Sequence, residues 1–229
     1  MNPISMKNAL AQLILQSDAL SKLTLLLLLF VSIICWTITF YKLFNLYNQK
    51  KQLQELENSI RTATDMQDLT QAVSAYRNSS AGDLVIRYLN SLKSVLKNKN
   101  SVNQLTDQEL DYLQYISDQN LDQIVYENET NLSILSVSAA VAPLLGLFGT
   151  VWGLIHSFVS ISALKNADIT TVAPGIAEAL IVTLAGLMVA IPALVSFHSI
   201  NTRIRDLEHK LQNLMAKVEF IVRHSSNSN

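Results

Sequence analysis

Three long stretches of this chain are almost free of charged residues, and this feature limits most strongly how the chain can fold. They are residues 23–41, 130–164 and 169–202, and only the last contains a charge, Glu178. An α-helix needs roughly 20 apolar residues to cross a membrane. Backbone polar groups find no water in lipid, so a single spanning segment must be helical. The sequence therefore predicts an all-α membrane protein with three transmembrane helices.

The composition agrees with this prediction, because 49% of the residues are hydrophobic and 15% are charged. A cleaved signal peptide is the alternative for the first stretch. Its apolar core is longer than the 7–15 residues typical of such peptides, and no A-x-A-like cleavage site follows it. A retained first span is therefore favoured.

Basic residues predict the orientation of the helices. Nine Lys and Arg lie between the first and second spans and five follow the third, whereas two precede the first span and one lies between the second and third. Cytoplasmic loops carry the excess of Lys and Arg, which predicts an outside N-terminus and an inside C-terminus. The predicted order is a periplasmic N-terminal segment (1–22), transmembrane helix 1 (23–41), a cytoplasmic helical region (42–130), transmembrane helix 2 with a cytoplasmic extension (131–162), a periplasmic loop (163–169), transmembrane helix 3 (170–200) and a cytoplasmic C-terminal helix and tail (201–229).

The two predicted cytoplasmic parts have helical patterns. Residues 42–130 contain one Gly and no Pro. The C-terminal part carries an apolar stripe at alternating steps of three and four, formed by Ile204, Leu207, Leu211, Leu214, Val218 and Ile221. Such a stripe needs a partner helix. That partner is either another helix of the same chain or a second copy, and the pattern favours neither.

Signatures of common enzymes are missing from the sequence. There is no phosphate-binding G-x-x-x-x-G-K-[ST] loop, no Cys/His group at metal-binding spacing and no G-x-S-x-G elbow. The single Cys35 cannot form an intrachain disulfide, and a net charge of −1 gives no reason to expect nucleic-acid binding. We expect a protein that is not an enzyme and that needs no metal or cofactor.

Small residues recur at helical spacing in the second and third spans. Five of the six Gly and three of the four Pro fall between positions 143 and 192. Small side chains let helix backbones approach closely in lipid, where no hydrophobic effect drives helices together. The predicted packing residues are Gly146, Gly149, Gly153, Gly175, Ala179 and Gly186.

Glu178 borders this small-residue face and should point toward protein. An acidic residue at the centre of a membrane helix costs roughly 2.5–3.5 kcal/mol on insertion scales, so it is normally paired, protonated or hydrated. A carboxyl group that titrates inside a membrane can carry protons. The alternative is a neutral Glu that is hydrogen-bonded to a backbone carbonyl and joins two helices.

Two sequence segments carry a resemblance to a known family. "APLLGLFGTVWGLIHSF" (142–158) and "VAPGIAEALIVTLAGLMVAIPA" (172–193) resemble the paired second and third spans of the TolQ/ExbB/MotA proton-channel family. "GLFGTVWG", the position of His156 and the chain length look more like the TolQ branch than the ExbB branch. Val182 and Leu184 are bulkier than the Ala common at those places in the family, which puts the local pore width in doubt.

The resemblance implies a subunit of a proton-driven motor in the inner membrane of a Gram-negative bacterium. In the family, five copies surround the membrane helices of a TolR-like or ExbD-like subunit, which carries a transmembrane Asp. The resemblance also implies a proton pathway through Glu178, Thr150 and Thr183. It further implies a TolA-like transducer that acts on outer-membrane integrity and division. An ExbB-like subunit for TonB-dependent uptake and a non-conducting membrane scaffold are the alternatives.

The predicted orientation can be tested by cysteine labelling. Cysteines introduced near Lys165 should react with an impermeant thiol reagent that is added from the periplasm. Cysteines near Lys50 or Lys210 should be protected until the membrane is permeabilised. The reverse labelling pattern would overturn the orientation and the direction of any proton path.

Overall fold

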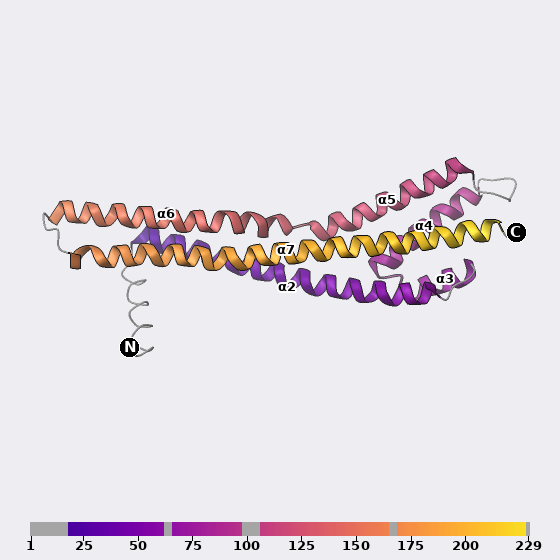
Figure 1. The fold of residues 1–229 in the computed structure, drawn as a ribbon, viewed down its shortest axis with the longest axis horizontal. Coiled ribbons are helices and arrows are strands. Elements are labelled where there is room, and N and C mark those ends of the chain that lie inside the picture. The colour runs from indigo at the N-terminus through magenta and orange to yellow at the C-terminus, as the bar shows by residue number, and fades with distance from the viewer. Residues whose placement is uncertain (1–17, 62–65, 98–105, 165–168, 228–229) are drawn as a thin grey trace. The chain divides into compact units, whose positions relative to one another are not determined.

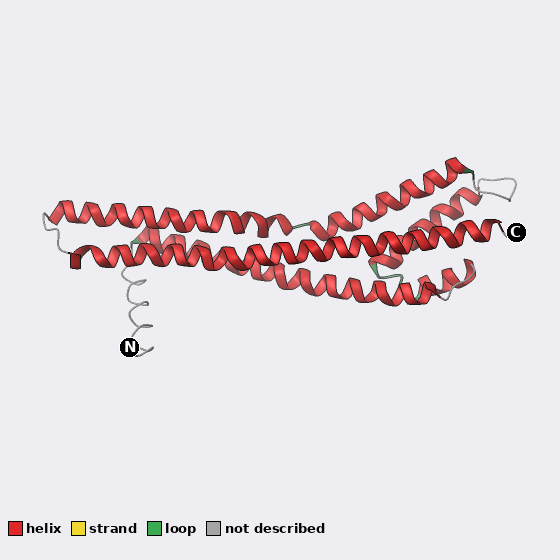
Figure 2. Ribbon diagram, viewed as in Figure 1, coloured by secondary structure: helices red, strands yellow, loops and turns green. Residues whose placement is uncertain are grey.

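The computed structural model describes residues 18–61, 66–97, 106–164 and 169–227, and the description below refers to these. They form α-helices and no strand (Figure 2). Most of the predicted N-terminal segment and of the loop at 163–169 lies outside them. The helices in chain order are α2 (Ala19–Arg61), α3 (Met66–Ser74), α4 (Ser80–Lys97), α5 (Asp107–Glu129), α6 (Leu132–Leu164) and α7 (Ile169–Asn227) (Figure 1).

Three of these helices, α2, α6 and α7, are long and apolar enough to cross a membrane. The predicted fold class is therefore confirmed: the protein is helical, and its membrane helices continue well beyond the apolar stretches. α2 has 43 residues and α7 has 59, whereas a span needs roughly 20. The helix extensions thus supply much of the remaining structure.

The chain divides into two compact units. The first unit comprises Met1–Phe40 and Asn131–Ser199, and the second comprises Tyr41–Thr130 and Ile200–Asn229. α2 and α7 contribute to both units. Each unit is described separately below.

The first unit contains the three apolar helix segments. Its side chains form a small core cluster in which Leu28 of α2 meets Ala142 of α6 and Ala190 of α7. Many large apolar side chains of this unit are exposed, among them Leu26, Phe148 and Met188. An exposed apolar surface of this kind suits a lipid environment.

The second unit has a core built from five helices. Its fully buried large side chains are Leu53, Leu56 and Ile60 of α2, Leu69 of α3, Leu84 and Tyr88 of α4, Leu113 of α5, and Ile200, Ile204 and Leu211 of α7. Five members of the predicted C-terminal stripe are buried here, namely Ile204, Leu207, Leu211, Leu214 and Val218. Ile221 is only half-buried, and the adjacent Val222 is buried instead. The stripe therefore packs within its own chain.

The end of α5 is held by side chains of α2. Lys42 is 5% exposed, and its Nζ donates hydrogen bonds to the backbone carbonyls of Asn128 at 2.8 Å and Glu127 at 3.3 Å. The amides of Gln49 and Asn128 exchange two hydrogen bonds, at 3.1 and 3.2 Å. A lysine ammonium is well suited to the unpaired carbonyls at a helix C-terminus. Asn131, just after this end, has a φ of 66°, a conformation that Asn tolerates better than most residues.

Two ion pairs join α2 to α7 in the second unit. Lys50 Nζ lies 2.7 Å from Asp206 Oδ2, and Lys217 pairs with Glu57. The hydrogen bond between Lys50 and Asp206 lowers the pKa of Asp206 and raises that of Lys50. Both side chains are nearly half exposed, so solvent screening leaves this pair a small contribution to stability.

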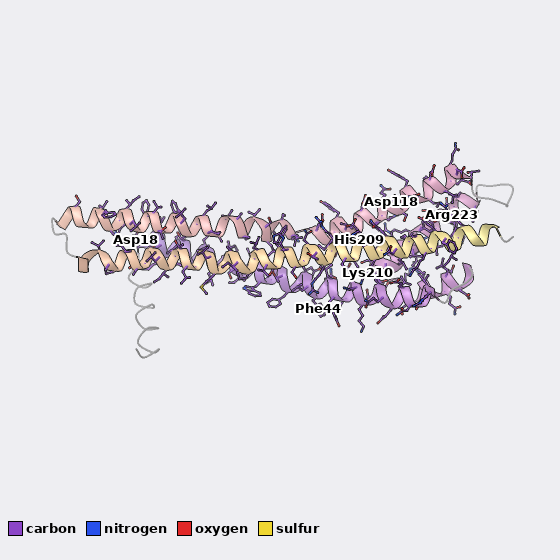
Figure 3. The ribbon with its side chains drawn as sticks, viewed as in Figure 1. Asp18, Phe44, Asp118, His209, Lys210 and Arg223 are labelled. Atoms are coloured by element: carbon purple, nitrogen blue, oxygen red, sulfur yellow. The ribbon has the colours of Figure 1, made fainter. Side chains whose placement is uncertain are left out.

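The surroundings of Glu219 on α7 disfavour the ionised form of its carboxyl group. Burial raises the pKa of its carboxyl, the charge of Asp118 adds to this effect, and Arg223 opposes it (Figure 3). Burial also raises the pKa of Tyr88 to about 12, and the charge of Glu219 contributes. The ionised form of Glu219 is thus less stable in the folded than in the unfolded chain.

We expect Glu219→Gln to stabilise the protein at neutral pH. Because the folded-state pKa of Glu219 is raised, its contribution favours folding at low pH and is lost as the pH rises through that pKa. The apparent melting temperature should rise by about 1–3 °C at pH 7, and this gain should disappear below about pH 4. Glu55→Gln, at an exposed position of α2, is the control and should change little. A lower melting temperature for Glu219→Gln at pH 7 would contradict this interpretation.

Candidate functional site

The helices α6 and α7 approach each other through small residues. A Cβ atom added at Gly146 would lie 3.0 Å from Thr183 Cα, and one added at Gly186 would lie 2.6 Å from the carbonyl oxygen of Ala142. Such distances leave almost no room for a side chain. The backbones of the two helices are therefore in direct contact, as Figure 1 shows for their neighbouring ribbons.

The same contact continues along both helices. A Cβ at Gly153 would lie 2.9 Å from the Cβ of Ala179, a side chain that is 1% exposed. Gly149 lies against Val182, and Gly175 lies against the hydroxyl of Ser157. All six small residues named in the sequence analysis thus face the opposite helix.

The two predicted pathway threonines bond in different ways. Thr183 Oγ1 donates to the carbonyl of Gly146 on the other helix, at 2.8 Å. Thr150 Oγ1 donates to Leu147 O of its own helix, at 2.7 Å. Within the described residues neither hydroxyl is bonded to Glu178. The hydroxyl of Thr183 therefore joins α6 and α7, whereas the hydroxyl of Thr150 bonds within its own helix.

Glu178 lies next to Ala179 on α7 and is half-buried. Its carboxylate accepts a hydrogen bond from the backbone N–H of Asp18, which directly precedes α2. The other charged or titratable groups that act on it are the side chains of Asp18, His156 and Lys22. The structure thus brings groups from the start of α2 and from α6 to this carboxyl group of α7.

Asp18 supplies a second carboxylate beside Glu178. It accepts a hydrogen bond from Trp152 Nε1 of α6 at 3.0 Å. We call Asp18, Trp152, His156 and Glu178 the carboxylate cluster; Figure 3 labels Asp18 at this place. A carboxyl group can bind and release a proton, and the ring nitrogens of an imidazole can donate or accept a hydrogen bond. This cluster can therefore exchange protons.

Sequence reasoning identified Glu178 but missed the other members of the carboxylate cluster. Asp18 falls within the predicted N-terminal segment (1–22), and His156 enters the sequence analysis only through the family resemblance. One local signal was available for Asp18, since Asp is a preferred residue directly before a helix. Trp152 lies inside the quoted "GTVWG" segment, but nothing in the sequence indicated its partner.

A metal site is not evident in the part of the chain that the structure describes. There, no three His, Cys, Asp or Glu side chains are grouped so that they could hold a metal ion.

Apolar helices in backbone contact, with a half-buried carboxyl group beside that contact, define a helical membrane protein that carries an ionisable group within its helix bundle. The chain belongs to the MotA/TolQ/ExbB proton channel family, whose model matches residues 89–213, more than half of the chain. This is a channel family and not a family of enzymes. The matched residues include Glu178, Thr150 and Thr183, but Asp18 lies outside them.

Individual relatives come from two branches of the family. The chain is 29% identical over 217 residues to the Tol-Pal system protein TolQ of Haemophilus influenzae, covering 89% of both chains. It is 28% identical to the biopolymer transport protein ExbB of Salmonella typhimurium, covering 88% of this chain and 81% of that protein. A TolQ protein of Pseudomonas aeruginosa is 46% identical over 72 residues, which is 31% of each chain.

The backbone contact predicts that two Gly→Ala changes will differ in effect. In an ordinary helix, Ala is favoured over Gly by up to about 1 kcal/mol. Gly186→Ala should nevertheless destabilise the protein, because the new Cβ meets a backbone carbonyl that cannot move without separating the helices. Gly175→Ala meets only the side-chain hydroxyl of Ser157, which can rotate.

Thermal unfolding in mild detergent measures this difference. The apparent melting temperature of Gly186→Ala should fall by several degrees more than that of Gly175→Ala. Equal melting temperatures for the two variants would contradict the backbone contact described here.

Proposed function

We propose that this chain is the proton-channel subunit of a Tol-Pal-type motor in the inner membrane of a Gram-negative bacterium. The observation that carries the proposal is the position of Glu178, a half-buried carboxyl group on an apolar helix of a proton channel family member. The similarity to TolQ over 89% of both chains supports this branch.

The proposed mechanism begins with the energy of the proton. A charge that crosses the membrane potential releases about 2.3 kcal/mol per 100 mV. This energy becomes motion only if each proton step favours a different arrangement of the subunits. The carboxyl group of Glu178 takes up and releases the proton within the membrane.

The partners follow from the family resemblance. Five copies of this chain form a ring around a TolR-like subunit whose transmembrane Asp exchanges the proton with the pathway. The resulting motion passes through a TolA-like transducer and supports outer-membrane integrity and constriction at division. The Thr150 hydroxyl can hydrogen-bond the partner's Asp in either protonation state.

Thr183 has a further role in this mechanism. Its hydroxyl joins α7 to the carbonyl of Gly146, so it holds the helix that bears Glu178 against α6. Interhelical hydrogen bonds in membranes contribute about 0.6 kcal/mol on average. Thr183 therefore acts on the pathway mainly through helix position, and Thr150 through its hydroxyl.

A second candidate is an ExbB-like subunit that energises TonB-dependent uptake. It is supported by the ExbB similarity over 88% of this chain. The two candidates share the proton chemistry and differ in their partners. Affinity purification of the tagged chain from its own organism separates them, because a TolR-like partner supports the first and an ExbD-like partner the second.

The test of the proton role compares two changes at Glu178. Glu178→Ala should abolish function, scored as detergent sensitivity and cell chaining, while protein level and oligomeric state stay normal. Glu178→Gln keeps the shape and most hydrogen bonds of a protonated Glu but cannot release a proton, so it should also fail. Proton flux through reconstituted complexes should fall at least about tenfold in both.

The outcome also separates a channel from a scaffold. If Glu178 only joins helices, Gln should replace it without loss. A fully active and normally assembled Glu178→Gln protein would therefore refute the proton role. Thr150→Ala and Thr183→Ala should impair flux to a similar or lesser degree, and Thr183→Ser should restore it because the hydroxyl is kept.

A further inference from the structure

Asp18 makes hydrogen bonds to the start of α2, to α6 and to Glu178 of α7. Its carbonyl accepts the first hydrogen bond of α2, from the backbone N–H of Lys22 at 3.1 Å. Its carboxylate accepts hydrogen bonds from the backbone N–H groups of Ala19 and Leu20, as an N-cap does, and from Trp152 Nε1 of α6. Its own backbone N–H donates to the carboxylate of Glu178 on α7.

These bonds restrict how Asp18 and Glu178 can move relative to each other. The side chain of Asp18 is held by the first turn of α2 and by Trp152, so its backbone N–H has a defined direction. A backbone N–H can only donate, and it therefore holds an oxygen of the Glu178 carboxylate. Without the hydrogen bond from Trp152, the side chain of Asp18 would no longer be held to α6.

The charges around Glu178 come from α2 and α6. They are Asp18 and Lys22 at the start of α2, and His156 on α6. α7 adds no other Asp, Glu, Lys or Arg between residues 169 and 202. Within the described residues, Asp18 is thus the acidic side chain that acts on Glu178.

We propose that Asp18 is a positioning residue for Glu178, held by Trp152, and that its negative charge sets the pH range in which Glu178 exchanges protons. The inference rests on the proposed function, in which Glu178 carries the proton. A like charge close to a carboxylate disfavours its ionised form. Removal of the Asp18 charge should therefore change the pH range over which Glu178 exchanges protons.

A simpler role for Asp18 is that of a helix cap alone. Asn caps a helix about as well as Asp, and its side-chain oxygen can also accept the hydrogen bond from Trp152. Asp18→Asn therefore removes the charge while it keeps the cap. If Asp18 only caps α2, the Asp18→Asn variant should have the wild-type pH profile.

The experiment measures proton flux against pH in vesicles that hold the complete complex with its partner subunit. Asp18→Asn should shift the pH of half-maximal flux by about 0.5 unit or more. Trp152→Phe keeps an aromatic ring but loses the N–H donor, and it should lower flux several-fold at the wild-type optimum. Both variants should retain the wild-type oligomeric state.

Matched controls come from residues outside the carboxylate cluster. Trp36→Phe changes a Trp of α2 that stacks on Phe40. Asp107→Asn removes a charge from the exposed first turn of α5. Both control variants should give the wild-type pH profile and flux.

Each outcome decides the inference. A wild-type pH profile for Asp18→Asn, or wild-type flux for Trp152→Phe, would overturn it. Glu178→Gln is measured in the same vesicles, because normal flux in that variant would refute the proposed function itself. If Glu178→Gln is inactive while Asp18→Asn and Trp152→Phe behave as wild type, only the inference about Asp18 fails.

Discussion

The direct backbone contact between α6 and α7 is the constraint on which the rest of the first unit depends. Lipid offers apolar helices no hydrophobic reason to associate, so their contact must come from close packing and hydrogen bonds. Gly146 and Gly186 permit that packing, and Thr183 adds a hydrogen bond across it. Because Ala179 is buried in the contact, the neighbouring Glu178 lies at its border and reaches groups of α2 and α6.

Glu178 is an acidic residue on an apolar helix, where a charge is costly. Insertion of an acidic residue into a membrane helix costs roughly 2.5–3.5 kcal/mol, and a proton crossing 100 mV releases about 2.3 kcal/mol. An acidic side chain within a membrane helix is normally paired, protonated or hydrated, so the groups around the carboxyl group decide whether it holds a proton. The backbone N–H of Asp18 and the charges of Asp18, Lys22 and His156 are surroundings of this kind.

Much of the fold was predictable because apolar length and helical periodicity are local properties. They gave the three membrane helices, the small-residue faces around Gly149 and Gly175, and most of the buried C-terminal stripe. Periodicity indicates which face of a helix is buried but not how far one helix is shifted along another. Glu178 is nine residues, or about 14 Å, beyond the start of α7. Only tertiary packing places the start of α2 beside Glu178. The hydrogen bond between Asp18 and Trp152 could therefore not be predicted from the sequence.

Infrared difference spectroscopy of the assembled complex tests the central claim most directly, because it observes the protonation of a carboxyl group itself. In membranes that hold the active complex, a change in pH should produce a carboxylic C=O band paired with a carboxylate band. Isotope labelling of glutamate should shift both bands, and the Glu178→Asp protein should alter their positions. These bands should titrate over the same pH range as proton flux. Proton flux that changes with pH while no glutamate band titrates would contradict it.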